Sequence, residues 1–240
     1  MTNPFLQLKD REAWGPGSFE MALPIVEAVG IKAGMRVLEV GGGSGQIAIT
    51  LAKHWNVTVF TLEPWRGGNE IQARAREAGV WDRVIALGMR AQNMRFADET
   101  FDAVISIGSF EMIGEERPQA LEQMVRVARR GARVGVAEPM CLPIPIPPDL
   151  RELDRARFTD GRGFEYHFRS ADWTAELFER AGLAVVERRY FPEANRWWRE
   201  FSERVSEAER ALIEADSGRW GTLGMVVGEK RADATGAVQK

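Results

Sequence analysis

The chain has 240 residues, of which 45% are hydrophobic and 28% are charged, and its formal net charge is −3. This length suits one α/β domain with a full core and is too short for two ordinary domains. The near-neutral, mixed charge gives no general attraction to nucleic acid, and a single cysteine, Cys141, excludes disulfide scaffolds and thiolate metal clusters.

Targeting signals and metal ligands are missing from the sequence pattern. The first 14 residues are polar and lack the basic and then apolar profile of a signal peptide. No stretch reaches the roughly 18 apolar residues that a membrane span needs. Two histidines are too few for a histidine-rich metal site. We therefore expect a cytoplasmic protein with no membrane or nucleic-acid partner and no bound metal ion.

Strands and helices alternate along the first half of the chain. Helices are predicted over 18–29, 45–55, 69–79 and 118–129, and strands over 35–40, 57–62, 84–87, 103–107 and 132–137. Such alternation predicts a mainly parallel sheet with helices on both faces. Ligands of such sheets bind beyond the carboxyl ends of the strands.

The strand over 35–40 runs directly into a glycine-rich turn. The turn contains Gly41, Gly42, Gly43 and Gly45, and the next helix starts there. Glycine allows positive φ and close approach of a ligand, and a helix start offers free N–H groups, so the pattern predicts a nucleotide-binding turn. The Gly-Lys-Ser/Thr ending of a phosphate-binding P-loop is absent. Gly43, Gly45 and Ala48 also fit the looser G-x-G-x-x-A pattern of a dinucleotide-binding turn.

The second strand, over 57–62, is followed directly by Glu63. A carboxylate at this point can accept two hydrogen bonds from the ribose diol of a nucleoside cofactor. A solvated residue at a strand end is the structural alternative. Glu63 therefore indicates a nucleoside ligand without deciding which one.

Two motifs together resemble those of class I S-adenosylmethionine (SAM) dependent methyltransferases. Glu39 precedes the glycines in an acid-x-G-x-G-x-G arrangement, and Phe101, Asp102, Val104 and Ser106 match an F-D-x-V-x-S strand of the family. The resemblance covers about residues 35–138. It implies a Rossmann-like, doubly wound α/β fold, with a seven-stranded, mostly parallel sheet and an antiparallel C-terminal strand. It also implies SAM as the cofactor and S-adenosylhomocysteine as the product.

The resemblance also implies how SAM would be held. The acidic residue, here Glu39, orients the amino group of the cofactor directly or through water, and Glu63 binds a ribose diol that NAD also carries. Many relatives have Gly-Asp-Ala in the adenine loop, but residues 88–91 read Gly-Met-Arg-Ala. Adenine would then be read by backbone groups of Ala91 and Gln92 and by packing against Met89. The cofactor-binding residues expected are Glu39, Gly41, Gly42, Gly43, Gly45, Glu63, Pro64, Trp65, Ala91, Gln92, Ser106 and Trp14, the last from a flap that closes over SAM.

The acceptor site carries less signal, because methyl transfer needs mainly positioning and exclusion of water. Residues 106–114 follow the fourth strand, where the family places acceptor-facing residues, and Glu111 would accept a proton or hold a cation. The Asp/Asn-Pro-Pro-Tyr/Phe tetrad of amide and base methyltransferases is absent. Tyr166 and His167 lie in an aromatic run, and histidine suits general base catalysis. The catalytic candidates are therefore Glu111, His167 and Tyr166; helix capping, ion pairing and ordinary packing are their structural alternatives.

The last 100 residues depart from simple alternation. Five prolines within 139–148 exclude a helix or a central strand and predict an extended apolar loop that opens a lid or acceptor segment over 139–168. A helix over 170–182 and the final strands over 183–190 and 224–230 follow. A long helix is predicted over 195–216 from an apolar stripe formed by Trp198, Phe201, Val205, Ala208 and Leu212. The stripe would pack on the sheet or a second subunit, or form a pocket wall.

The sequence thus predicts a single methyltransferase domain over 1–230, with an N-terminal flap and helix over 1–30 and a disordered tail over 231–240. The expected function is methyl transfer from SAM to an oxygen, sulfur or nitrogen atom of a small-molecule acceptor, by in-line displacement that positioning and desolvation favour. A homodimer is a further option. Two alternatives stay open: a non-catalytic SAM-binding or scaffold protein, and an NAD-linked oxidoreductase. The second predicts a catalytic Tyr/Lys or His/Asp set beside the nicotinamide, and the chain has no Tyr-x-x-x-Lys motif.

Overall fold

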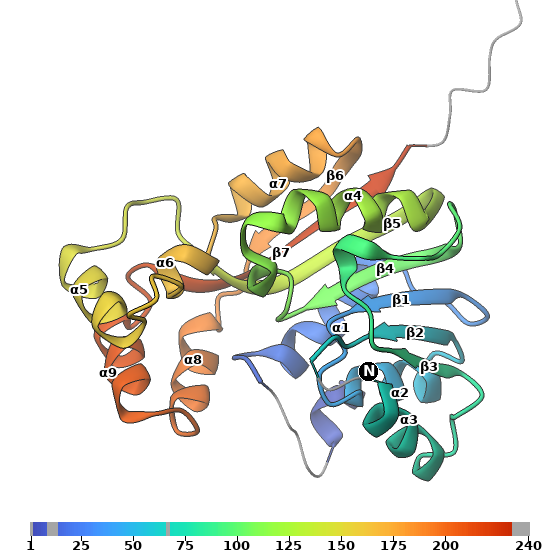
Figure 1. Ribbon diagram of the computed structural model, residues 1–240. Coiled ribbons are helices and arrows are strands. Elements are labelled where there is room, and N and C mark those ends of the chain that lie inside the picture. Colours follow the sequence, from blue (N-terminus) through green and yellow to red (C-terminus); the bar gives the residue numbers. More distant parts are fainter. Residues whose placement is uncertain (1, 9–13, 66–67, 232–240) are drawn as a thin grey trace, which may run out of the picture.

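A computed structural model describes residues 2–8, 14–65 and 68–231. Its centre is a seven-stranded sheet in the order β3-β2-β1-β4-β5-β7-β6 (Figure 1). The strands are β1 (Arg36–Val40), β2 (Thr58–Leu62), β3 (Val84–Leu87), β4 (Phe101–Ile107), β5 (Ala128–Cys141), β6 (Leu183–Tyr190) and β7 (Gly221–Lys230). Pairs from β3 to β5 are parallel, and β7 is antiparallel to both of its neighbours. The predicted doubly wound α/β sheet with an antiparallel C-terminal strand is confirmed.

Helices cover both faces of this sheet (Figure 1). On one face lie α1 (Ser18–Val29), α2 (Gln46–His54) and α3 (Gly68–Glu77), and on the other lie α4 (Arg117–Val127) and α7 (Ala171–Arg180). Each helix turns an apolar face to the sheet, so each side buries its own core. Short 3-10 turns, η1 (Pro4–Gln7), η2 (Ala91–Asn93) and η3 (Glu111–Glu116), fill connections between these elements.

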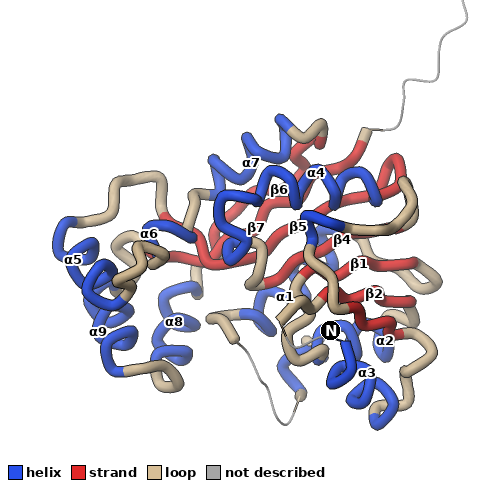
Figure 2. Tube along the Cα trace, in the orientation of Figure 1, coloured by secondary structure: helices blue, strands red, loops and turns tan. Residues whose placement is uncertain are grey.

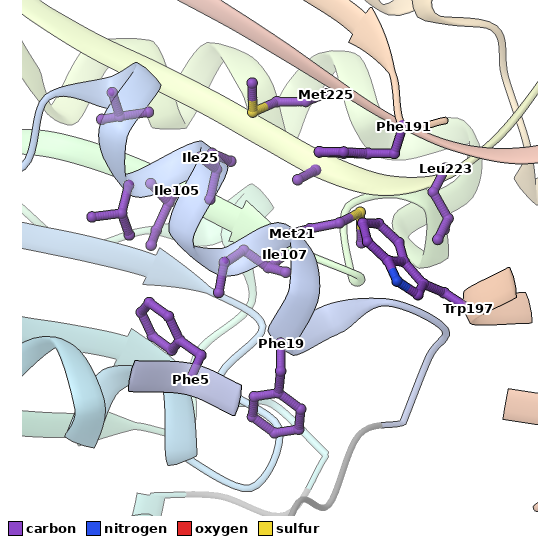
Figure 3. Packing of buried hydrophobic residues seen from close by; sticks show 14 of the residues in the cluster. Phe5, Phe19, Met21, Ile25, Ile105, Ile107, Phe191, Trp197, Leu223 and Met225 are labelled. Atoms are coloured by element: carbon purple, nitrogen blue, oxygen red, sulfur yellow. The ribbon is translucent and has the colours of Figure 1, made fainter. Parts of the chain in front are cut away.

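The hydrophobic core beneath α1 holds the start of the chain near the carboxyl ends of the strands. Figure 3 shows Met21 and Ile25 of α1 lying against Ile105 and Ile107 of β4, and all four side chains are buried. Gly17, which precedes α1, has a positive φ of 65°, and a Cβ there would lie 2.8 Å from Leu223 and from Trp197. This close packing holds the start of α1 against β7, which contains Leu223, and against the helix that contains Trp197.

Four helices gather at one end of the sheet, away from α4 and α7 (Figure 2). They are α5 (Pro148–Arg157), α6 (Phe164–His167), α8 (Ala194–Ser202) and α9 (Glu207–Asp216), and α5 and α8 both pack on α9. We call residues 142–168 and 194–220 the helical cap. The predicted lid and the predicted inserted helix therefore form one structure, although 25 residues separate them in the chain.

The prediction of one long helix over 195–216 is wrong, because the chain breaks between α8 and α9. Ser206 has an extended backbone, and its hydroxyl accepts a hydrogen bond from the N–H of Glu209 at 3.3 Å, so it starts a new helix. The apolar stripe is interrupted at the same place, since Ala208 is exposed whereas Phe201 and Leu212 are buried.

The prediction that the proline-rich segment starts at 139 as a loop is also wrong, because β5 continues to Cys141. The pairing of β5 with β4 ends at Ala137, and beyond this residue β5 pairs with β7, with Pro139 opposite Leu223. A proline has no N–H to donate and is tolerated where a strand behaves as an edge. The extra residues carry Glu138 and Pro139 toward the cap.

Candidate active site

A pocket of about 790 Å³ lies beyond the carboxyl ends of β1, β2 and β4 and reaches under the helical cap. Its sheet end is lined by residues 40–44, 62–65, 89–92 and 107–109. Its cap end is lined by Phe158, Phe164, Phe168, Trp198 and Phe201. One cavity therefore joins the glycine turn to an aromatic chamber.

Two glycines of the turn differ in what surrounds the position that a Cβ would occupy. Gly41 has a φ of 84°, and a Cβ there would run into the side chain of Ser109, so this glycine is needed for packing within the chain. Gly43 has a φ of 52°, but no atom of the described residues lies within 4 Å of the position of its Cβ. Because Gly43 lines the pocket, that space is available to a ligand that approaches the backbone.

Glu63 connects the turn with the next loop. Its buried carboxylate accepts hydrogen bonds from the N–H of Gly43 at 2.9 Å and from the N–H of Trp65 at 2.9 Å. Pro64 and Trp65 line the pocket beside it, and Trp65 and Trp14 are 78% and 47% exposed at its rim. The arrangement fits a ribose diol, because each carboxylate oxygen has a second lone pair to offer.

The adenine loop also reaches the pocket. Met89, Ala91 and Gln92 all line it, next to Arg90. The side-chain amide of Gln92 donates to Glu116 at 2.7 Å, which leaves the backbone of this loop, rather than that amide, to meet a ligand. Recognition of adenine by Ala91 and Gln92 stays a prediction.

Glu39 lies behind the pocket rather than in its lining. It is 1% exposed, and its carboxylate accepts a hydrogen bond from the hydroxyl of Thr61 at 2.6 Å. Burial raises the pKa of Glu39 to about 8; the bond from Thr61 opposes this and the charge of Glu63 adds to it. Contact of Glu39 with the amino group of SAM would require water or a movement of its side chain.

The raised pKa of Glu39 predicts a pH-dependent stability. A carboxyl group that is protonated in the folded protein and ionised in the unfolded chain stabilises the fold at low pH and loses this contribution as pH rises through the folded pKa of about 8. We expect the free energy of unfolding to fall between about pH 5 and 8, with a Glu39 contribution on the order of a few kcal/mol. Urea unfolding of the wild type and of Glu39→Gln across this range measures it. Equal slopes in the two proteins would contradict the assignment.

Two residues predicted to contact the cofactor lie outside the pocket lining. Ser106 is fully buried outside the pocket lining, and its hydroxyl donates to the carbonyl of Val40 at 2.9 Å. Gly45 also lies outside the lining; it precedes α2, where a Cβ would meet Ile71. Ser109, which the sequence analysis did not single out, lines the pocket and donates to the same Val40 carbonyl at 2.8 Å.

Of the three catalytic candidates, Glu111 and His167 line the pocket and Tyr166 does not. Nδ1 of His167 lies 3.1 Å from the carbonyl oxygen of Glu111. A carbonyl only accepts, so Nδ1 carries a proton and Nε2 keeps a lone pair. Burial lowers the pKa of His167, the bond to Glu111 opposes this, and three neighbouring arginines lower it further. Tyr166 packs beside Gly114, whose φ is 68°.

Glu138 is a second buried carboxyl group beside Glu111, which the sequence analysis did not identify. Glu111 is 4% exposed and Glu138 is 2% exposed. Burial and the charge of Glu138 raise the pKa of Glu111 well above its ordinary value. Burial raises the pKa of Glu138 to about 7, against the lowering effect of Arg117. Glu111 follows the end of β4, and Glu138 lies in the part of β5 that extends beyond its pairing with β4. This extension of β5 brings the two residues together.

Arg117 is the cation nearest to these carboxyl groups. It is 2% exposed, and it donates to the carbonyls of Gly114 at 2.8 Å and of His167 at 2.9 Å. Its guanidinium also lies 5.0 Å from the ring centroid of Trp173, close enough for a cation–π interaction. Arg117 therefore ties η3, α6 and α7 together behind the pocket.

The cap end of the pocket is an aromatic chamber formed by both cap segments. The rings of Phe164 and Phe168 stack with centroids 4.7 Å apart, and Trp198 of α8 lies 5.5 Å from Phe164. Part of the stripe predicted over 195–216 thus forms a pocket wall as well as core. Such a chamber suits a flat or bulky apolar molecule.

No group of three or more His, Cys, Asp or Glu side chains in the described parts of the chain is placed to hold a metal ion. No helix among the described residues combines the length and apolarity that crossing a bilayer requires.

Residues 37–131 match a family model described as a methyltransferase domain. Among curated proteins, the chain is 33% identical over 119 residues to the methyltransferase GfsG of Streptomyces halstedii, which covers 49% of this chain and 42% of that protein. The chain spans about half the length, or less, of the curated relatives it matches.

Two solved structures share the fold over most of the chain. The cyclase SpnF superimposes with a TM-score of 0.75 at 18% identity, covering 89% of this chain and 81% of that one. The geranyl diphosphate C-methyltransferase of Streptomyces coelicolor A3(2), solved with Mg²⁺, geranyl diphosphate and S-adenosylhomocysteine, gives 0.73 at 16% identity, with 88% and 77% covered. At these identities the likeness concerns the fold.

Proposed function

We propose that this chain is a class I SAM-dependent methyltransferase and that it transfers a methyl group from SAM to an oxygen, sulfur or nitrogen atom of a small, largely apolar molecule. The observation that carries the proposal is the continuity of the pocket. The glycine turn and Glu63 lie at one end, the aromatic chamber lies at the other, and Glu111 and His167 line the space between. A cofactor and an acceptor would meet within a single cavity.

The residues at the sheet end fit SAM. The open space at Gly43 admits a ligand against the backbone, Glu63 offers acceptors for a ribose diol, and residues 89–92 border the space for adenine. When bound, SAM supplies an activated methyl group on a positively charged sulfur. The protein then has to align the acceptor with that methyl group, exclude water under the cap and remove any proton that the acceptor loses.

Calorimetric titration with SAM, S-adenosylhomocysteine and NAD in parallel tests this proposal first. Micromolar binding of the first two compounds and none of NAD is the expected result, followed by release of S-adenosylhomocysteine in a screen of small acceptors. Binding of NAD alone would overturn the assignment. Binding of SAM without turnover on any acceptor would favour a non-methylating protein.

Glu63→Ala is expected to weaken SAM binding by about 1.5–3 kcal/mol, the range for hydrogen bonds to a charged group. The carboxylate binds both the N–H of Gly43 and that of Trp65, so its loss also loosens the turn. Calorimetry measures the change. Glu70→Ala, on the exposed start of α3, is the control and should bind SAM normally. An unchanged dissociation constant for Glu63→Ala would show that Glu63 does not hold the ribose.

A different reaction within the same fold is the second candidate. One of the structural neighbours is described as a cyclase, and the fold alone does not decide the chemistry. A protein of this kind would bind SAM or S-adenosylhomocysteine with ordinary affinity. It would convert its substrate without releasing S-adenosylhomocysteine, which mass spectrometry of the product separates from methylation by the missing gain of one CH₂ group.

A further inference from the structure

The Glu111 and Glu138 side chains form a buried carboxyl pair at the wall of the pocket, which Glu111 lines and Glu138 does not. Each residue has one carboxyl oxygen, Oε2, that is buried and has no hydrogen-bond partner among the described residues. A buried acceptor without a partner is costly, so such an atom indicates a missing partner. Since Glu111 lines the pocket, a donor on the acceptor molecule can be that partner once the Glu111 side chain turns its buried Oε2 toward the space.

The charge around the pair favours a neutral donor. Arg117 lies beside both carboxyl groups, and Arg169 lies near Arg117. Arg162 lines the pocket near His167. A pair that holds one shared proton has one negative charge, which Arg117 balances. An ammonium group would therefore meet no uncompensated negative charge here, whereas a hydroxyl group can donate to the free oxygen.

We propose that Glu111 and Glu138 act as one proton acceptor for a hydroxyl group, so that the molecule methylated is a phenol or an alcohol. This inference rests on the proposed function and names its acceptor class and its base. Glu111 is the catalytic residue, since it lines the pocket. Glu138 lies behind it and acts through it.

The proton balance follows from the shared proton. The O–H bond of the acceptor breaks, its proton goes to Oε2 of Glu111, and the proton already on Glu111 passes to Glu138. The electron pair of that bond stays on the acceptor oxygen for its new bond to the methyl carbon, and the sulfur keeps the pair of the broken carbon–sulfur bond. The pair ends with two protons and no charge, and it returns to its singly protonated form, paired with Arg117, when it releases a proton to solvent after the product leaves.

His167 is a weaker base for this step, although Nε2 is free to accept. Protonation of its ring would add a cation beside Arg117, Arg162 and Arg169, which all lower its pKa. Protonation of the carboxyl pair instead removes a buried charge. His167 is therefore assigned to positioning, through its bond to the carbonyl of Glu111.

The test measures the release of S-adenosylhomocysteine with a panel of phenols led by 2-naphthol, with the matched aromatic amines led by 2-naphthylamine, and with 4-nitrophenol as a phenol that is largely ionised at the assay pH. We expect phenols to be methylated and cationic amines, represented by 2-naphthylmethylamine, not to be. A neutral aromatic amine such as 2-naphthylamine can donate to the free oxygen, and it tests whether the site selects oxygen over nitrogen. Glu111→Gln should slow 2-naphthol by about 100- to 10,000-fold, the contribution of a general base. It should slow 4-nitrophenol far less, because that proton is already gone. Glu115→Gln, an exposed residue of the same turn, is the matched control.

The pH profile tests the role of Glu138. The pair must lose its first proton before it can act as a base. Turnover of 2-naphthol should therefore rise as pH passes the pKa of Glu138, about 7. Among the described residues, the charged group that faces the pair is Arg117 of α4; Tyr166 and Arg169 act on Arg117, and the ring of His167 bonds to the backbone carbonyl of Glu111. Glu138→Gln removes the group whose ionisation sets this rise and leaves Glu111, whose pKa burial holds well above its ordinary value, so the midpoint of the profile should move to higher pH. A purely structural role would leave the profile in place.

Several results would overturn the inference. Turnover of the amines and not of the phenols would contradict the acceptor class, and so would no turnover of any phenol by a protein that binds SAM. An equal loss of rate on 2-naphthol and on 4-nitrophenol in Glu111→Gln would contradict the role of the base, and so would an unmoved pH profile in Glu138→Gln. If SAM does not bind at all, the proposed function fails. The shared proton can then still be tested by the pH dependence of the stability of the protein without ligands. Its stability should fall less with rising pH in Glu138→Gln than in the wild type, because raised carboxyl pKa values stabilise the fold only at low pH. Equal slopes would overturn the pair itself.

Discussion

Replacing Gly43 with alanine is expected to abolish most SAM binding while the protein stays folded. The Cβ would meet no atom of the described residues within 4 Å, so the fold does not exclude it. The φ of 52° makes alanine strained by roughly 1–2 kcal/mol, which a domain of this size tolerates. The same Cβ would occupy the space beside the turn in which the cofactor packs. We expect the dissociation constant for SAM, measured by calorimetry, to rise by about 100-fold or more, equivalent to roughly 3 kcal/mol.

Gly34→Ala is the matched control for this prediction. Gly34 also has a positive φ, 84°, and no atom of the described residues within 4 Å of its Cβ position, but it lies outside the pocket lining. Both variants should lose a similar amount of stability in urea, and only Gly43→Ala should lose affinity. Normal SAM binding by Gly43→Ala would remove the cofactor from this turn. Gly41→Ala should differ from both, because its Cβ runs into Ser109 and would disturb the turn itself.

The fold was predictable because its signals are local. The strand over 35–40 leads into glycines whose positions and φ angles fit the turn, and α1 begins and ends at the predicted residues 18 and 29. Hydrophobic periodicity marks such elements well. The antiparallel β7 was expected only from resemblance to a family, and the order of the strands was not predicted, since strand order is not written in any one segment.

The composition of the site was harder to predict, because it depends on which way side chains point. Ser106 and Ser109 lie three residues apart after the same strand, yet Ser109 lines the pocket and Ser106 does not. Nothing in the local pattern distinguishes them. Glu39 matches its motif, but the structure places its carboxyl against Thr61, outside the lining.

Glu138 and the split helix show two further limits. Glu138 was missed because five prolines from 139 onward suggested that the strand ends before them, whereas pairing with β7 continues to Cys141. A charged residue at the end of an otherwise apolar strand was the signal that could have identified it. The break at Ser206 was signalled by Ser206 and Glu209, which have the spacing of a helix start.

Replacing Arg117 with methionine is expected to destabilise the protein by about 3–5 kcal/mol, the range for removing one partner of buried charges. Arg117 is 2% exposed, and methionine keeps much of its volume but none of its charge. The variant leaves Glu111 and Glu138 without their nearest cation and frees the carbonyls of Gly114 and His167. Urea unfolding followed by circular dichroism measures the loss. Arg180→Met, at an exposed pair with Glu176, should change stability by less than about 1 kcal/mol.

The dependence of this loss on pH separates charge from packing. Arg117 lowers the pKa of both glutamates, so its removal raises both values and weakens the fold most where the pair is ionised. The difference between Arg117→Met and the wild type should therefore grow as pH rises above about 7, the pKa of Glu138 in the folded wild type. Adding Glu138→Gln to Arg117→Met should recover part of the stability at the higher pH, since it removes a buried charge that has lost its partner. A loss that stays constant with pH and is not relieved by Glu138→Gln would show that Arg117 acts only through its carbonyl contacts and its packing on Trp173.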